Sequence, residues 1–309
     1  MYSLSLQEFI NEFNFQIASG EEFVESKKIT TPELNRPAIQ LAGFYDHFDA
    51  ERPQMIGMVE HSFLSKLEAN FRKETLKKLF SYKEMPCFIL SRSLEPFPEM
   101  LEYATESEIP VLVSDAKTTE LTGDILNWLK VKLAPRTTVH GVLVDIYGEG
   151  VLIMGESGIG KSEAALELVK RGHRLVADDA VEIKKISHDN LTGSCPKLIR
   201  HFIEVRGIGI INIKQMFGVQ SVMDSSKIDL VIKFEPWEKG KVYDRIGLNE
   251  EYIDILETKI VCHTIPIRPG RNAAVICEAA AVNRRQKKMG YNAAQVLNDR
   301  IMQNMQNNA

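Results

Sequence analysis

The sequence predicts an α/β protein made of two domains. Its 309 residues are about twice the length of a typical single domain. Within residues 1–130, short apolar segments alternate with segments of helical spacing, a pattern that favours a layered α/β domain. Within residues 151–172, an apolar strand, a glycine-rich turn and a helix follow one another. We therefore expect an N-terminal α/β domain over residues 1–132 and a second domain over residues 133–309.

The N-terminal domain is expected to contain strands at 38–45, 87–92 and 109–115 and helices within 4–14, 61–80 and 117–133. This half of the sequence has no phosphate-binding loop and no metal-ligand spacing. The sequence therefore assigns it no chemistry, and a regulatory or assembly role is a hypothesis only.

The second domain is expected to begin near residue 132, because Pro135 breaks the preceding helical pattern. Two strands within 138–154 are joined by a turn at 147–150, and a helix over 161–172 ends at Gly172. Another strand is predicted within 173–186. From about Cys277 the sequence is helical, and Leu297, Ile301 and Met305 recur every four residues along one face.

Composition excludes several classes of protein. Hydrophobic residues make up 44% of the chain and charged residues 26%, unlike a disordered, collagen-like or disulfide-scaffold sequence. No apolar run reaches the roughly 18–20 residues of a membrane span, so no membrane partner is expected. The acidic N-terminus does not resemble a signal peptide. The four cysteines form no CxxC pair, which favours reduced thiols and a cytoplasmic location.

Charge is distributed unevenly along the chain. Residues 1–130 hold 13 basic and 21 acidic residues, whereas residues 131–309 hold 25 basic and 21 acidic residues. The second half is therefore the expected host of an anionic ligand such as a nucleotide. It has no basic stripe interleaved with aromatic residues, so no nucleic-acid partner is expected.

A complete GxxxxGK[ST] motif lies between the predicted strand and helix of the second domain. Backbone N–H groups of such a loop form an anion-binding nest, and the following helix N-terminus adds partial positive charge. Lys161 is expected to reach the β- and γ-phosphates of a nucleotide, and Ser162 to offer its hydroxyl to Mg²⁺. The predicted phosphate-binding residues are Gly155, Glu156, Ser157, Gly158, Ile159, Gly160, Lys161 and Ser162.

Two adjacent carboxylates end the next apolar segment, at Asp178 and Asp179. A carboxylate beside a phosphate loop can bind a metal or accept a proton from an attacking hydroxyl. The alternative is a solvated turn or a helix cap, in which acidic residues are common. Adjacent side chains on a strand end diverge, so the sequence leaves open which of the two faces the phosphate.

Three further charged or polar residues flank these motifs. His140 lies in an apolar strand, where a histidine is more often structural than catalytic. Glu204 and Arg206 share one face of a predicted strand, where the carboxylate is a candidate Mg²⁺ ligand. The alternative for this pair is a surface salt bridge.

More cationic residues follow, at Arg245 and in a stiff loop suited to holding a phosphate. The alternative for the loop is a rigid surface turn. The run 284–288 is interpreted as the solvated side of a helix. The loop residues concerned are Pro266, Ile267, Arg268, Pro269, Gly270 and Arg271.

Taken together, four motifs resemble the HPr kinase/phosphorylase family, the bifunctional sensor enzymes of bacterial carbon catabolite control. The motifs are GESGIGKSE (155–163), LVADDAVEI (175–183), IEVRGIGIIN (203–212) and IPIRPGRN (265–272), in the order and spacing of the family. The resemblance implies a C-terminal P-loop kinase domain with a phosphoenolpyruvate-carboxykinase-like fold, behind a layered α/β domain. It further implies a homohexamer that phosphorylates a serine of HPr with ATP or pyrophosphate and Mg²⁺, and dephosphorylates it with inorganic phosphate.

The resemblance also implies roles for individual residues. Lys161 contacts the phosphates, and Ser162 and Glu204 hold Mg²⁺. Asp179 accepts a proton in the kinase direction and donates one in reverse, with His140 and Arg245 as further catalytic residues. The segment 203–212 serves both reactions, and 266–271 serves chiefly dephosphorylation.

Two other functions stay open at this point. A metabolite kinase or carboxykinase would use the same phosphate loop with a buried pocket for a small organic acid. A non-enzymatic regulator would bind the nucleotide without turning it over. Phosphorylation of HPr by the purified protein separates the family reading from both.

Overall fold

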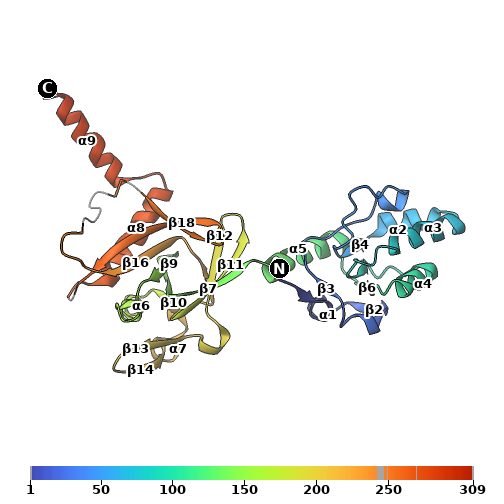
Figure 1. Cartoon of the computed structure of the whole chain (residues 1–309), viewed down its shortest axis with the longest axis horizontal. Coiled ribbons are helices and arrows are strands. Elements are labelled where there is room, and N and C mark those ends of the chain that lie inside the picture. Colours follow the sequence, from blue (N-terminus) through green and yellow to red (C-terminus); the bar gives the residue numbers. More distant parts are fainter. Residues whose placement is uncertain (1, 242–246, 249, 269, 308–309) are drawn as a thin grey trace. The chain divides into compact units, whose positions relative to one another are not determined.

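The computed structural model describes residues 2–241, 247–248, 250–268 and 270–307. Contacts divide the chain into two compact units, the first ending at Ala134 and the second starting at Pro135. Both units contain sheets and helices, which confirms the predicted α/β class (Figure 1). None of the helices in the described ranges combines the length and the hydropathy that a membrane span requires.

The first unit contains a four-stranded sheet in the order β2-β6-β5-β4, in which β4, β5 and β6 run parallel and β2 runs antiparallel to β6. Its strands are β1 (Leu4–Ser5), β2 (Gln16–Ser19), β3 (Lys28–Ile29), β4 (Gln54–Ile56), β5 (Phe88–Leu90) and β6 (Val111–Val113). Its helices are α1 (Leu6–Phe13), α2 (Met58–Lys66), α3 (Ala69–Phe80), α4 (Pro98–Glu106) and α5 (Thr118–Lys132), with 3₁₀ turns η1 (Glu21–Phe23) and η2 (Gln40–Ala42).

Alternation along the strands places two separate cores on the two faces of this sheet. Ile89 and Leu112 pack in one core with residues of α1 and α5. Phe88 and Leu90 pack in the other core with residues of α2, α3 and α4. Successive side chains of a strand point to opposite faces, so strands buried on both sides read as continuous apolar runs. The unit is therefore a three-layered α/β domain.

One expected element of this unit is wrong, and one segment expected to be helical is divided into two helices. The segment 38–45 is not a strand: it contains the 3₁₀ turn η2, which ends at Gly43 with a φ of 97°. The Leu41 N–H bonds to the Pro37 carbonyl, so local turns satisfy the backbone groups that a strand would offer to a sheet. The helix expected over 61–80 is two helices, because Leu67 and Glu68 between α2 and α3 adopt extended backbone.

The second unit contains a six-stranded sheet, β10-β8-β9-β16-β18-β17, a four-stranded sheet, β15-β12-β11-β7, and the hairpin β13-β14. Its strands are β7 (Arg136–His140), β8 (Val142–Ile146), β9 (Glu149–Met154), β10 (Arg174–Ala177), β11 (Ala180–Ser187), β12 (Asn190–Ser194), β13 (Phe202–Val205), β14 (Gly209–Asn212), β15 (Ser225–Lys227), β16 (Leu230–Pro236), β17 (Glu251–Ile255) and β18 (Thr258–Ile267). Its helices are α6 (Lys161–Lys170), α7 (Ile213–Phe217), α8 (Ala273–Lys288) and α9 (Ala293–Asn307), with 3₁₀ turns η3 (Lys197–Ile199) and η4 (Val219–Ser221). The strand expected within 173–186 is interrupted at Asp178 and Asp179, between β10 and β11.

The six-stranded sheet is covered by helices on one face and by the four-stranded sheet on the other. Ile153 and Ile232 pack in a core with Leu168 of α6 and Cys277 of α8. The opposite face packs residues of β8, β9 and β16 against β11 and β12. Strand β16 pairs parallel to both β9 and β18, so these three strands end at the same edge of the sheet. In open sheets of this kind, ligands bind at the carboxyl ends of the parallel strands.

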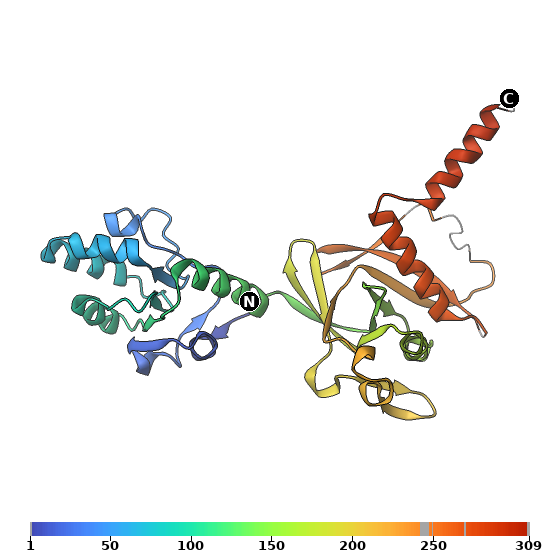
Figure 2. The same cartoon turned by 180° about the vertical axis from the view of Figure 1, so that it is seen from behind.

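The basic run at 284–288 is more than the solvated side of a helix, contrary to expectation. Lys288 Nζ lies 2.7 Å from a carboxylate oxygen of Asp229 and also pairs with Glu149. Lys287 Nζ lies 3.2 Å from Glu250. These ion pairs connect the end of α8 to the sheet, beyond which α9 extends away from the rest of the unit (Figure 2).

Gly150 in β9 is expected to be indispensable for folding, because there is no room for a side chain. A Cβ added there would overlap the Lys227 carbonyl oxygen and lie 2.7 Å from Ser226 Oγ. We expect Gly150→Ala to lower the free energy of unfolding by about 3 kcal/mol or more. Gly123→Ala, in the exposed interior of α5 with no atom near its Cβ, is the control and should stabilise by about 0.5–1 kcal/mol. Thermal denaturation of both variants checks this, and a wild-type melting temperature for Gly150→Ala would contradict it.

Candidate active site

The phosphate-loop motif connects the end of β9 to the start of α6, at the edge where the parallel strands end. Its glycines take backbone conformations that other residues rarely adopt, with φ values of 148° at Gly155, 83° at Gly158 and 97° at Gly160. Gly160 is the N-cap of α6, and no side chain caps that helix terminus. The free N–H groups and the helix dipole therefore face the same loop, which suits an anion.

Lys161, the first residue of α6, holds the loop closed. Its side chain is buried, and Nζ donates hydrogen bonds of 2.9 Å to the carbonyls of Gly155 and Glu156. Burial lowers the pKa of the Lys161 ammonium, while the neighbouring carboxylates of Asp178 and Asp179 oppose that shift. A cation is thus fixed inside the loop, where the phosphates of a nucleotide would lie.

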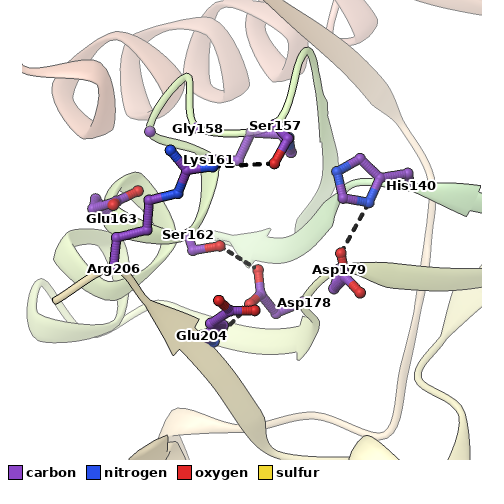
Figure 3. A pocket seen from close by; sticks show the side chains of 11 residues that line it. His140, Ser157, Gly158, Lys161, Ser162, Glu163, Asp178, Asp179, Glu204 and Arg206 are labelled. Carbon is purple, nitrogen blue, oxygen red and sulfur yellow. Dashed lines mark hydrogen bonds and ion pairs between the residues drawn. The ribbon is translucent and has the colours of Figure 1, made fainter. Parts of the chain in front are cut away.

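Asp178 joins the phosphate loop to the hairpin β13-β14. The Ser162 hydroxyl donates to Asp178 Oδ1 at 2.9 Å, and the Glu204 backbone N–H donates to Oδ2 at 3.0 Å (Figure 3). Burial raises the pKa of the Asp178 carboxyl, against the effect of these two hydrogen bonds. Asp178 is therefore a buried carboxylate that fixes the two segments expected to meet the metal.

Asp179 has a different environment from its neighbour. It adopts a left-handed backbone with a φ of 66°, which turns its side chain away from that of Asp178. Its carboxylate is exposed to solvent, and Oδ1 lies 2.9 Å from His140 Nδ1. The pairing of β7 with β11 sets this contact, because His140 lies opposite Ala180 and the Gly141 N–H bonds to the Asp179 carbonyl. Asp179 is thus oriented by His140 and open to an incoming hydroxyl.

Arg206 and Glu204 reach the same pocket from the hairpin (Figure 3). Arg206 Nη2 donates to Ser157 Oγ at 3.3 Å, and its guanidinium lies against Gly158. No salt bridge joins Arg206 to Glu204 among the described residues, so the simple surface pair is not formed. The residues lining the pocket are His140, Ser157, Gly158, Gly160, Lys161, Ser162, Glu163, Asp178, Asp179, Glu204 and Arg206.

The side chains around Ser162 are oxygen donors of the kind that Mg²⁺ prefers. The hydroxyl of Ser162 and the carboxylate of Asp178 are in contact, and Glu204 lines the same pocket. Within the described ranges, no three His, Cys, Asp or Glu side chains form a ready metal cluster. Mg²⁺ typically uses one or two protein carboxylates together with water and substrate phosphates, so this sparse donor set fits it.

Comparison with known proteins identifies the family. Residues 4–129 match the family model described as HPr Serine kinase N terminus, and residues 131–301 match HPr Serine kinase C-terminal domain. The chain belongs to the HPr kinase/phosphorylase family. A protein of that name from Lachnoclostridium phytofermentans is 55% identical over 305 residues, covering 99% of this chain and 98% of the relative. Another from Caldicellulosiruptor bescii is 48% identical with the same coverage.

A solved structure of an Hpr(Ser) kinase/phosphatase from Coxiella burnetii is also similar to the chain. It is 36% identical, covers 52% of this chain and 98% of its own, and superposes with a TM-score of 0.47.

The described residues of the fourth motif of the HPr kinase/phosphorylase family do not line this pocket. Arg268 and Arg271 follow β18 and are not among the described residues that line it. Arg268 stacks on Trp237, and Arg271 Nη1 donates to the Pro266 carbonyl at 2.7 Å. Gly270 has a φ of 82°. Ile267 ends β18, and Arg245 and Pro269 lie outside the described residues.

Two residues near these groups, Glu163 and Trp237, carry no sequence motif of their own. Glu163 lines the pocket from the first turn of α6, and its only signal is its position directly after the family motif's serine. Trp237 contacts Arg268 although 31 positions separate them in the chain. The signal for the contact between Trp237 and Arg268 is topological, since Trp237 directly follows β16 and Arg268 directly follows its paired strand β18.

Proposed function

We propose that this chain is a bifunctional enzyme that phosphorylates a serine of HPr with ATP and removes that phosphate by phosphorolysis. The observation that supports it most is the carboxylate pair Asp178 and Asp179, one buried against Ser162 and the other exposed beside His140. A phosphate loop alone binds nucleotide, whereas an exposed, oriented carboxylate beside it supplies a proton acceptor. The name HPr kinase/phosphorylase, carried by relatives about half identical to the chain, supports the proposed pair of reactions.

In the kinase direction, the serine oxygen of HPr attacks the γ-phosphorus of ATP, and the bond to the β–γ bridging oxygen breaks. Asp179 takes the serine proton, and His140 keeps its carboxylate oriented. Lys161 and Arg206 lie where charge develops on the transferring phosphoryl group and on the leaving ADP. Fixed cations in such a site lower the barrier without reorganising during the reaction.

In the reverse direction, an oxygen of inorganic phosphate attacks the phosphorus of phosphoserine. The phosphorus–serine oxygen bond breaks, the serine oxygen takes a proton from protonated Asp179, and pyrophosphate is released. Phosphorolysis is the reverse of serine phosphorylation by pyrophosphate, and the base of a forward step is the acid of its reverse, so one carboxylate serves both reactions. The phosphate loop then holds inorganic phosphate in place of a nucleotide phosphate.

Ser162 and Glu204, with Asp178 between them, would hold Mg²⁺ at this site. When bound, the ion neutralises charge on the phosphates and draws their oxygens toward the loop. Asp178 keeps the Ser162 hydroxyl and the Glu204 backbone in place for that purpose.

A paired assay tests the proposal. Purified protein with ATP and HPr should yield phosphoserine, and phosphoserine-HPr with inorganic phosphate should yield pyrophosphate in equal amount to the serine released. Dephosphorylation that proceeds without added phosphate and releases no pyrophosphate would contradict phosphorolysis. Failure to label HPr would contradict the proposal as a whole.

The same proposal includes a cytoplasmic homohexamer. The four cysteines are buried free thiols, as in proteins kept in a reducing compartment. Leu297, Ile301 and Met305 expose apolar side chains along α9, a surface suited to burial against another copy. Light scattering should give six times the 35.0 kDa mass of the chain.

A further inference from the structure

Trp237 and Arg268 form a stacked pair at the edge of the sheet that carries the phosphate loop. The Arg268 guanidinium carbon lies 3.5 Å from the centroid of the Trp237 ring. At this distance the flat guanidinium covers the face of the indole, where a cation–π attraction is strongest. Trp237 is one of only two tryptophans in the chain.

The backbone fixes this pairing from two paired strands. Pro236, the last residue of β16, lies opposite Ile267, the last residue of β18. The Trp237 N–H donates to the Ile267 carbonyl at 3.1 Å, so the residues that follow the two strands stay side by side. The stacked pair is therefore set by the sheet register.

The same strands bring the pair to the edge that carries the phosphate loop. Strand β9 runs parallel to β16 and leads into Gly155. A Cβ on Gly155 would lie 2.6 Å from the carbonyl oxygen of Phe234, three residues before Trp237. The loop after β18 thus follows the same sheet edge as the loop that binds phosphate.

Stacking occupies the face of the guanidinium and leaves its edge available. All five N–H donors of arginine lie in the guanidinium plane, so a partner on the face uses none of them. Arg268 makes no hydrogen bond or ion pair with any residue in the described ranges. Arg271, by contrast, already donates to the Pro266 carbonyl. Toward the described residues, Arg268 therefore keeps all five donors for a tetrahedral oxyanion, whereas Arg271 uses one of its five on that carbonyl.

We infer that Trp237 is a positioning residue for phosphorolysis: its ring holds Arg268 with its N–H edge directed to incoming inorganic phosphate. The inference rests on the proposed function. Inorganic phosphate has no adenosine to anchor it, so its binding depends on cations that are already oriented. ATP carries its own triphosphate chain into the phosphate loop, so its binding depends much less on the platform, the Trp237 ring that orients Arg268.

Four variants test the inference: Trp237→Leu, Trp237→Phe, Arg268→Ala and the double variant Trp237→Leu/Arg268→Ala. Phosphorolysis and kinase rates are measured on each, together with an equilibrium titration of inorganic phosphate. Trp237→Leu should raise the KM for phosphate about tenfold and change kinase kcat by less than about twofold. Trp237→Phe, which keeps an aromatic face, should stay within about threefold of wild type.

The double variant separates a platform from a merely structural residue. If Trp237 acts through Arg268, the double variant should be no worse than Arg268→Ala alone. The inference would be overturned if the effects of the two single substitutions on phosphorolysis multiplied in the double variant. It would also be overturned if Trp237→Leu lost kinase and phosphorolysis activity equally. Trp128→Leu is the matched control: Lys132 Nζ lies 5.1 Å from that ring in the first unit, and its loss should leave the ratio of the two activities unchanged.

The phosphate titration keeps this inference distinct from the proposed function. Weaker phosphate binding in Trp237→Leu, with no phosphate-dependent reaction even in wild type, would refute phosphorolysis and support the platform. Active phosphorolysis with an unchanged KM in Trp237→Leu would refute the platform and leave the proposed function standing.

Discussion

Lys161→Ala is expected to reduce both the kinase and the phosphorylase rate by at least about 10²–10³-fold. Both reactions are proposed to bind phosphate in the same loop, 155–162. Lys161 is the buried cation of that loop, and its Nζ donates hydrogen bonds to the carbonyls of Gly155 and Glu156. Loss of Nζ removes charge stabilisation from the transition state and also the two hydrogen bonds that close the loop. Single-turnover measurements in both directions on the same preparation provide the check.

Lys170→Ala is the matched control for this prediction. Lys170 is the last residue of the same helix and is exposed. Its loss should leave both rates within about twofold of wild type, as expected for a surface change. Retention of phosphorylase activity by Lys161→Ala would refute the hypothesis that both reactions use the same phosphate-binding loop.

Asp179→Asn should lower kcat in both directions by about 10²–10⁴-fold and leave the affinity for ATP nearly unchanged. Asparagine keeps the shape of the side chain and its contact with His140, but it cannot take or return a proton. Asp189→Asn removes a carboxylate from a similar pair, with His188 Nδ1 at 2.9 Å, on an exposed turn outside the pocket, and should have no effect. A large loss of ATP affinity in Asp179→Asn would instead place this residue in nucleotide binding.

Asp178→Asn should behave differently, since Asp178 holds Ser162 and Glu204 together. Burial raises the pKa of Asp178, so its contribution to stability is largest at low pH and declines as the pH rises through the pKa of the folded state. Replacement by a neutral amide should therefore leave the protein folded at neutral pH, as its melting temperature would report. The expected defect is a higher Mg²⁺ requirement, because an anionic oxygen beside Ser162 is lost.

Local signals predicted much of the fold and of the phosphate loop. A strand, a glycine-rich turn and a helix are encoded by neighbouring residues, and the loop at 155–162 has the backbone that its glycines suggested. The strand expected at 38–45 is wrong: Leu41 is buried from a 3₁₀ turn instead of from a sheet, and Ile39 and Phe44 are exposed. Over a short segment, the pattern of apolar residues suggests that side chains are buried, but it does not show whether a strand, a helix or a turn carries them.

The distribution of roles between neighbours depends on contacts that are distant in sequence. Asp178 and Asp179 are chemically identical, and the hydrogen bond from the Glu204 backbone and the pairing with His140 distinguish them. Those partners lie 26 and 39 positions away, on strands whose order the sequence does not state. The same holds for Arg268, whose partner is set by the parallel register of β16 and β18.

Gly158 occupies a position that the phosphate-loop motif leaves open to any residue. In this chain the guanidinium of Arg206 fills the space beside it, since a Cβ there would lie 2.8 Å from Cζ and 2.9 Å from Nη2 of Arg206. That guanidinium ends a flexible side chain and can move aside, so the φ of 83° is the firmer reason for a glycine at 158. Arg206 belongs to a hairpin 48 positions later in the sequence, so this loop residue contacts a segment that the motif does not contain. The consequence is that a side chain at 158 would displace the guanidinium of Arg206 and its hydrogen bond to Ser157, so a substitution in the loop would be felt in the hairpin.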